Sequence, residues 1–170
     1  MNGKRLFCLL AALVMGFCLF GCDRTPAPAP DDPIWEPSAP EKTDLTQLLT
    51  AEEVSEAVGT TVGAGTLQDG GTVLSFSSED YAVQVVLLVE EPVGDAETYF
   101  EAVTGNYEEG ALSPAPNLGK TAYWCGTTGE LLVCGEGQVF SLNIMSEEMG
   151  EETRLIAARQ LAVLVLGRLG

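Results

Sequence analysis

The sequence predicts an α+β domain built on a largely antiparallel sheet of about six strands covered by helices, in the order α-βββ-α-βββ-α. Three observations support this fold class. Short stretches with strand character are separated by turns of hairpin length, which is typical of antiparallel strands. The stretch 81–90 is apolar on both faces, so a strand there needs cover on both sides. Three further segments have helix signals, and helices packed on an antiparallel sheet define the α+β class.

The first helix has a complete start signal. Thr50 and Glu53 form the pattern of a capping box, in which each side chain satisfies a backbone amide of the other residue. Leu49 and Val54 stand at the two positions of a hydrophobic staple. Gly59 suits the left-handed conformation that ends many helices. These signals predict a helix from about residue 51 to residue 58.

Three strands and a second helix follow. The strands are predicted over residues 61–67, 72–77 and 81–90, with a Gly-rich turn at 68–71. Pro92 ends the third strand because it cannot donate a ladder hydrogen bond. Asp95 then caps a short helix that runs to about Val103 and is closed by Gly105.

The second half of the domain repeats this organisation. Residues 106–117 have loop composition, and three strands are predicted over 120–125, 130–134 and 138–145. The final helix is predicted from about Glu151 to Arg168. Apolar residues recur along it at helical spacing, and its terminal charges complement the helix dipole.

Residues 1–21 have the layout of a secretory signal peptide. Lys4 and Arg5 precede an apolar run over residues 6–20. A helix of that length covers ~23 Å, which is short for the ~30 Å hydrocarbon core of a membrane. A short membrane anchor and a buried core helix are the alternative interpretations of this run.

The run ends in Leu19-Phe20-Gly21-Cys22, which resembles the lipobox of bacterial lipoprotein precursors. The resemblance implies cleavage after Gly21 and thioether lipidation of Cys22. Phe20 is bulkier than that family usually carries at its position. The mature protein would then be held at the extracytoplasmic face of the cell membrane by the lipid on Cys22, with two acyl chains giving a stable anchor.

Residues 22–43 form a predicted tether between the lipid and the domain at 44–170. Six of the nine prolines fall in this segment. Proline fixes φ and removes a backbone donor, so the segment is expected to be extended and semi-rigid. The sequence therefore divides into a signal peptide (1–21), a tether (22–43) and a single domain (44–170).

The segment Leu118-Gly119-Lys120-Thr121-Ala122-Tyr123-Trp124 resembles a signature of small secreted lipoprotein domains of the PsbP-like superfamily. That signature has an acidic residue where this chain has Lys120. The family also opens with a helix like the one after Leu49 and closes with a helix rich in Ala and Leu. The resemblance implies a binding or sensing scaffold without a shared catalytic site, and it names no ligand.

Composition excludes several classes of function. The chain has no His, which removes the commonest general base and metal ligand. The net charge of -17 argues against nucleic acid as a partner, because phosphate binding needs clustered Lys and Arg. No nucleotide-binding, hydrolase or zinc motif occurs in the sequence. The acidic runs lack the spacing of a calcium loop, so neither a metal nor a cofactor is expected.

These observations favour a membrane-anchored binding, sensing or accessory module that is not an enzyme, with a protein or a small molecule as its partner. The alternative is an envelope hydrolase that uses paired carboxylates, since such pairs come together only in the fold. Tyr123 and Trp124 are the candidate ligand or partner surface. Because neighbouring strand residues point to opposite faces, at most one of the two is expected in the inner layer of the sheet.

Two cysteines, Cys125 and Cys134, lie in the predicted domain. If Gly129 and Glu130 form a two-residue hairpin loop, Cys125 pairs with Cys134 at a Cα separation of ~4.5 Å, which allows a disulfide. A four-residue loop, 126–129, would instead place Cys125 opposite Glu130 and keep the thiols apart. The disulfide is the favoured expectation, and two buried free thiols are the alternative.

Overall fold

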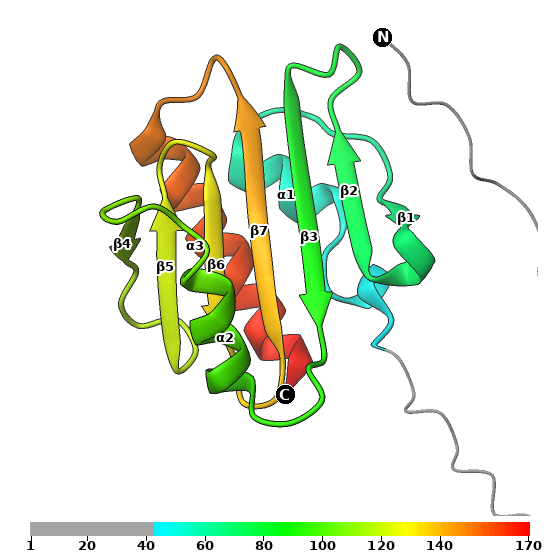
Figure 1. The fold of residues 1–170 in the computed structure, drawn as a ribbon. Coiled ribbons are helices and arrows are strands. Elements are labelled where there is room, and N and C mark those ends of the chain that lie inside the picture. Colours follow the sequence, from blue (N-terminus) through cyan, green and yellow to red (C-terminus); the bar gives the residue numbers. More distant parts are fainter. Residues whose placement is uncertain (1–42) are drawn as a thin grey trace, which may run out of the picture. The chain divides into compact units, whose positions relative to one another are not determined.

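The computed structural model describes residues 43–170, and these residues form one antiparallel seven-stranded sheet with helices on both sides (Figure 1). The strand order is β1-β2-β3-β7-β6-β5-β4. The α+β class and the antiparallel sheet predicted from the sequence are confirmed. The predicted signal peptide, the lipobox with Cys22 and the tether up to residue 42 lie outside the described residues. Within 43–170, no helix has both the length and the apolar character needed to cross a membrane.

The observed elements follow the predicted order with one additional strand. The chain forms, in sequence, η1 (Leu45–Gln47), α1 (Ala51–Val58), β1 (Thr66–Gln68), η2 (Asp69–Gly71), β2 (Val73–Ser77), β3 (Val83–Glu90), α2 (Ala96–Thr104), β4 (Leu112–Pro114), β5 (Thr121–Cys125), β6 (Glu130–Cys134), β7 (Val139–Ser146) and α3 (Glu151–Leu169).

Two strands differ from the prediction. β1 is only three residues long, and the start of the predicted strand 61–67 contributes a single bridge between Val62 and Ser78. β4 lies inside the segment predicted as a loop, where it pairs with β5 at the edge of the sheet. Pro114 belongs to this strand, and an edge strand tolerates proline because one side of it needs no donor. Turn-like composition therefore concealed an edge strand.

The predicted helix ends are present. The side chain of Thr50 accepts a hydrogen bond from the Glu53 amide, and the Glu53 carboxylate accepts one from the Thr50 amide. Gly59 ends α1 in the left-handed conformation, at φ 71°. Asp95 caps α2 by accepting from the Thr98 amide at 2.8 Å.

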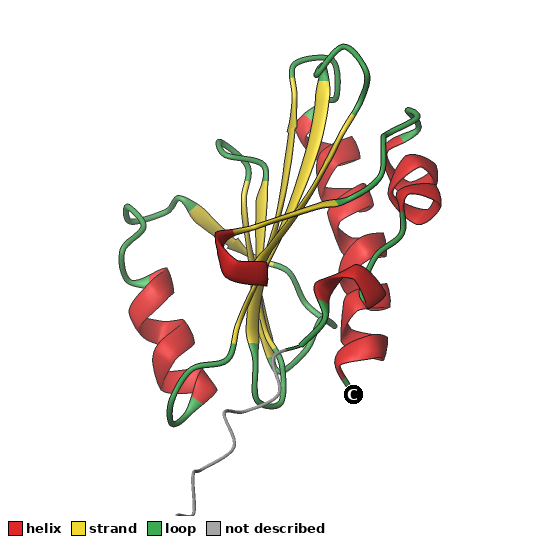
Figure 2. Cartoon of the chain, turned by 90° about the vertical axis from the view of Figure 1, so that its right-hand side faces the viewer, coloured by secondary structure: helices red, strands yellow, loops and turns green. Residues whose placement is uncertain are grey.

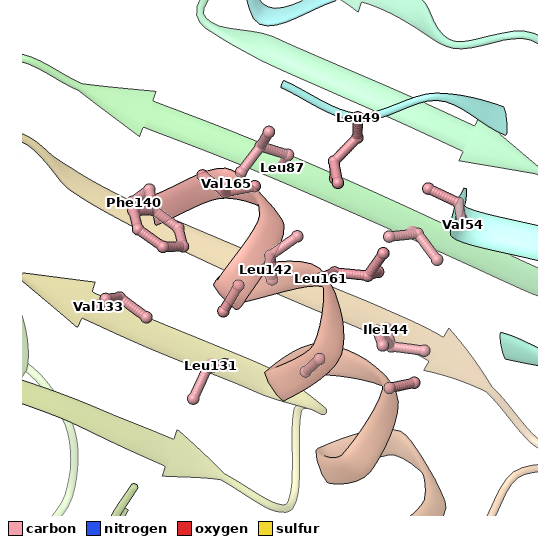
Figure 3. Packing of buried hydrophobic residues seen from close by; sticks show 14 of the residues in the cluster. Leu49, Val54, Leu87, Leu131, Val133, Phe140, Leu142, Ile144, Leu161 and Val165 are labelled. Carbon is pink, nitrogen blue, oxygen red and sulfur yellow. The ribbon is translucent and has the colours of Figure 1, made fainter. Parts of the chain in front are cut away.

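The main core lies between one face of the sheet and the helices α1 and α3 (Figure 2). Figure 3 shows α3 lying over the central strands, with Leu161 and Val165 above Leu142 of β7. The register continues this layer across the sheet, because Leu142 lies opposite both Leu87 of β3 and Leu131 of β6. All five side chains are fully buried.

The second face of the sheet is only partly covered. Helix α2 packs on β6 and β7, and Phe100 of α2 stacks on Tyr123 of β5 with ring centroids 6.0 Å apart. Val86 and Leu88 of β3 are half-buried on this face, beyond α2. The predicted cover on both faces is therefore incomplete at β3, because the single short helix on that side reaches mainly the β6 and β7 half (Figure 1).

Candidate functional site

A pocket of about 520 Å³ lies at the end of the sheet where three connections meet. These are the β2–β3 turn, the β5–β6 turn and the β7–α3 loop, all at the upper end of the sheet in Figure 1. The volume is within the range of ~300–1,000 Å³ that is usual for small-molecule sites. The lining residues come from all three connections and from the strands and helix next to them: Tyr81, Ala82, Gln84, Thr128, Met145, Ser146, Glu147, Glu148 and Arg154.

The β2–β3 turn holds an exposed tyrosine in an unusual backbone conformation. Tyr81 has φ 60° and a side chain that is 71% exposed. A positive φ is uncommon for a bulky residue and needs support from its surroundings. Asp80 supplies that support by accepting hydrogen bonds from the Ser78 hydroxyl at 2.7 Å and the Ala82 amide at 3.1 Å. These bonds hold the pKa of Asp80 below its ordinary value, so the carboxylate stays charged and the turn stays in place.

The β5–β6 turn is fixed to the rest of the fold by three long-range hydrogen bonds, one of which runs from the Ile144 amide to the Gly129 carbonyl at 2.8 Å. The Asn143 amide donates to the Thr128 carbonyl at 3.3 Å, and the Arg154 guanidinium donates to the Gly126 carbonyl at 3.1 Å. Gly129 has φ 73°, and a Cβ atom there would overlap the Ile144 carbonyl and the Arg154 guanidinium. Only glycine therefore allows this turn to approach β7 and α3 so closely.

The β7–α3 loop brings two carboxylates to the pocket. The Ser146 hydroxyl accepts hydrogen bonds from the amides of Glu148 and Met149, at 3.2 and 3.3 Å, and so shapes the start of the loop. Glu147 and Glu148 are exposed and line the pocket. Neither forms an ion pair with another residue of the described chain.

Arg154 is the only basic residue among those lining this pocket, and it forms no salt bridge within residues 43–170. Lys120 pairs with Glu97, and Arg168 pairs with Glu53. The Nε atom of Arg154 is buried without a hydrogen-bond partner in the described residues. Arg154 also stands near the N-terminal end of α3, where the helix dipole disfavours a cation. Helix stability therefore does not account for a cation at this position.

The predicted surface formed by Tyr123 and Trp124 is present only in part, because Trp124 is buried whereas Tyr123 is half-buried and lines a small pocket of about 220 Å³. Trp124 faces the main core, is 3% exposed, and donates from its indole to Glu151 at 3.4 Å. Tyr123 faces α2 and is half-buried against Phe100. The prediction that Trp124 is available to a ligand is wrong, because each face of β5 is packed against a different helix layer.

The segment 118–124 serves the packing of β5. Leu118, Ala122 and Trp124 are buried in the main core. Gly119 has φ 54°, and a Cβ atom there would overlap the carbonyl of Cys134. Lys120 donates its amide to the same carbonyl at 2.8 Å and pairs with Glu97 at 3.0 Å. In this chain the segment that resembles the PsbP-like signature positions a strand and does not line the pocket at the upper end of the sheet.

The predicted disulfide between Cys125 and Cys134 is wrong in the structure, where both thiols are free and buried. Residues 126–129 form a four-residue turn in which the Gly129 amide donates to the Cys125 carbonyl at 2.9 Å. Cys125 consequently lies opposite Glu130, and Cys134 lies opposite Thr121. The contacts of this turn with Asn143 and Arg154 select the longer loop, and the longer loop keeps the thiols apart.

Sequence reasoning missed Tyr81 and Arg154 as site residues. A cation at the wrong end of a helix dipole was a usable signal for Arg154. No comparable signal marked Tyr81, because its importance depends on the turn that holds it. No group of three or more Cys, Asp or Glu side chains within residues 43–170 is arranged to hold a metal ion.

Comparison with known proteins gave no match for this chain among protein-family models, curated proteins or solved structures.

Proposed function

We propose that this protein is a lipid-anchored binding module at the extracytoplasmic face of the cell membrane. The signal layout that ends at Cys22 supports the anchor, and the Pro-rich segment after it supports a spacer between lipid and domain. The resemblance to PsbP-like lipoprotein domains supports binding or sensing in preference to catalysis.

The observation that carries the binding role is the pocket with Arg154 in its wall. The three connections that surround it are each held by their own hydrogen bonds, so the backbone around the pocket is fixed before a ligand binds. A fixed backbone lowers the conformational entropy that is lost on binding. Arg154 donates to the Gly126 carbonyl and has no carboxylate partner within residues 43–170, so its charge is not neutralised there by the protein.

Two experiments test this proposal. For the anchor, the full chain and its Cys22→Ala variant are produced in bacteria that are fed a labelled fatty acid. Label in the parent protein and none in the variant is the expected result. Equal labelling of both proteins would contradict the anchor.

For the binding role, the membrane-extracted protein is screened against small molecules by thermal shift, and each ligand is recovered and analysed afterwards. Stabilisation with unchanged ligand is expected of a binding module. Conversion of the ligand into a hydrolysis product would favour the carboxylate hydrolase instead.

A further inference from the structure

We propose that the pocket around Arg154 binds a small zwitterion, namely an amino acid or a short peptide with a free amino group and a free carboxylate. This inference rests on the proposed binding function and names the class of ligand.

The first step is the charge pattern of the pocket. Arg154 supplies one guanidinium, and Glu147 and Glu148 supply two carboxylates, none of them paired within the described chain. A purely anionic ligand would meet the repulsion of both glutamates and of a protein with net charge -17. A purely cationic ligand would be attracted by both glutamates and would leave Arg154 without an anionic partner. A ligand that carries both charges can pair its carboxylate with Arg154 and its amino group with the glutamates.

The second step is the geometry of the cation. The Nη2 atom of Arg154 donates to the Gly126 carbonyl at 3.1 Å, so the guanidinium is held against the β5–β6 turn. The Cβ position of Gly129 lies 2.6 Å from Nη1, so this side of the group also lies against the turn. A guanidinium in a fixed orientation can donate a charge-assisted hydrogen bond to a carboxylate from the Nη hydrogens that the turn leaves unused.

The third step is the remaining lining of the pocket. Met145 is 42% exposed and Tyr81 is 71% exposed, and both line the pocket beside the amide of Gln84. Met and Tyr offer apolar contact area, and an amide can hydrogen-bond a peptide group. The pocket thus combines an anion receptor, a cation receptor and an apolar wall, which are the complements of the three parts of a peptide.

The test uses the dipeptide alanyl-phenylalanine in four forms: free, N-acetylated, C-amidated, and blocked at both ends. Isothermal titration calorimetry is performed on the full chain in mild detergent. The free dipeptide is expected to bind at least about tenfold more tightly than either singly blocked form, because each blocked form loses one charge-assisted contact. The doubly blocked form is expected to bind most weakly.

Variants assign each charge to its receptor. In Arg154→Gln, amidation of the dipeptide should no longer weaken its binding, whereas acetylation should weaken it as in the parent protein. In the double variant Glu147→Gln/Glu148→Gln, acetylation should no longer weaken binding, whereas amidation should still weaken it. Arg159→Gln is the matched control, because Arg159 lies on the same helix, donates to the Pro116 carbonyl and does not line the pocket. If circular dichroism shows that Arg154→Gln is unfolded, Arg154→Lys replaces it and should weaken binding of the free carboxylate selectively.

Three results would overturn the inference: equal binding of the free and doubly blocked forms, unchanged penalties in the variants, or no binding of any form at millimolar concentration. Tight binding of a singly blocked or neutral compound at this pocket would also contradict the assignment of a zwitterionic ligand. It would remain consistent with the proposed binding function. Failure of Cys22 to take a lipid would contradict the anchored function without affecting the calorimetry.

Discussion

Substitution of Glu53 by glutamine should destabilise the domain by an amount that depends on pH. Glu53 accepts hydrogen bonds from both terminal nitrogens of Arg168, and Arg168 Nη1 also donates to the Leu48 carbonyl at 2.7 Å. The pair therefore joins the start of α1 to the end of α3. Glutamine keeps one acceptor oxygen for the Thr50 amide, removes the charge and replaces the oxygen that accepts from Arg168 Nη2 by an amide donor.

The magnitude follows from the pKa of Glu53. The hydrogen bonds from Arg168 lower the pKa of Glu53 from 4.5 to about 2. At ~1.36 kcal/mol per pKa unit, this sets a ceiling of ~3.4 kcal/mol. The two side chains are 25% and 33% exposed, so solvent screening reduces the expected loss at pH 7 to about 1–2 kcal/mol.

The direction of the pH dependence is determined by this lowered pKa. Because the folded state holds Glu53 at a lower pKa than the unfolded chain, its contribution is present above pH 4.5 and is lost as the pH falls towards 2. Urea denaturation of parent and variant should give a difference in unfolding free energy that is largest at pH 7 and close to zero near pH 2. Glu56→Gln, on the same helix, is the control and should change stability by less than ~0.5 kcal/mol at either pH.

Two outcomes would refute this reasoning. One is a loss in Glu53→Gln that is the same at pH 7 and near pH 2. The other is a double-mutant cycle of Glu53→Gln and Arg168→Gln with no interaction energy, since residues that contact each other should be non-additive.

Three further predictions concern the fold. Gly119→Ala should cost about 1–3 kcal/mol in urea denaturation, because φ 54° strains an L residue and the new Cβ would overlap the Cys134 carbonyl; an unchanged midpoint would contradict this. Alkylation of the denatured, unreduced segment 44–170 should add two labels, one on each of Cys125 and Cys134, whereas no labelling before reduction would show that the two cysteines form a disulfide. The isolated segment 44–170 should unfold in one cooperative thermal transition, and a broad melt that sharpens when the tether is restored would show that the tether belongs to the fold.

The sequence by itself determined the elements whose stability comes from near neighbours in the chain. The capping box of Thr50 and Glu53, the Asp95 cap and the Gly59 terminus each involve contacts within four residues, and all three are present in the structure. Alternation of apolar residues located β2, β3 and β5–β7 to within a few residues, because the side-chain period of a strand is a property of the strand itself.

The tertiary structure decided what depends on distant segments. The β5–β6 turn takes four residues because Asn143 and Arg154 hold it from β7 and α3, and that choice alone separated Cys125 from Cys134. The same long-range contacts form the pocket, which joins residues from three connections spread over more than 70 positions of the chain. No local pattern can encode such a site, because its members become neighbours only when the sheet orders its strands and brings these connections to one end.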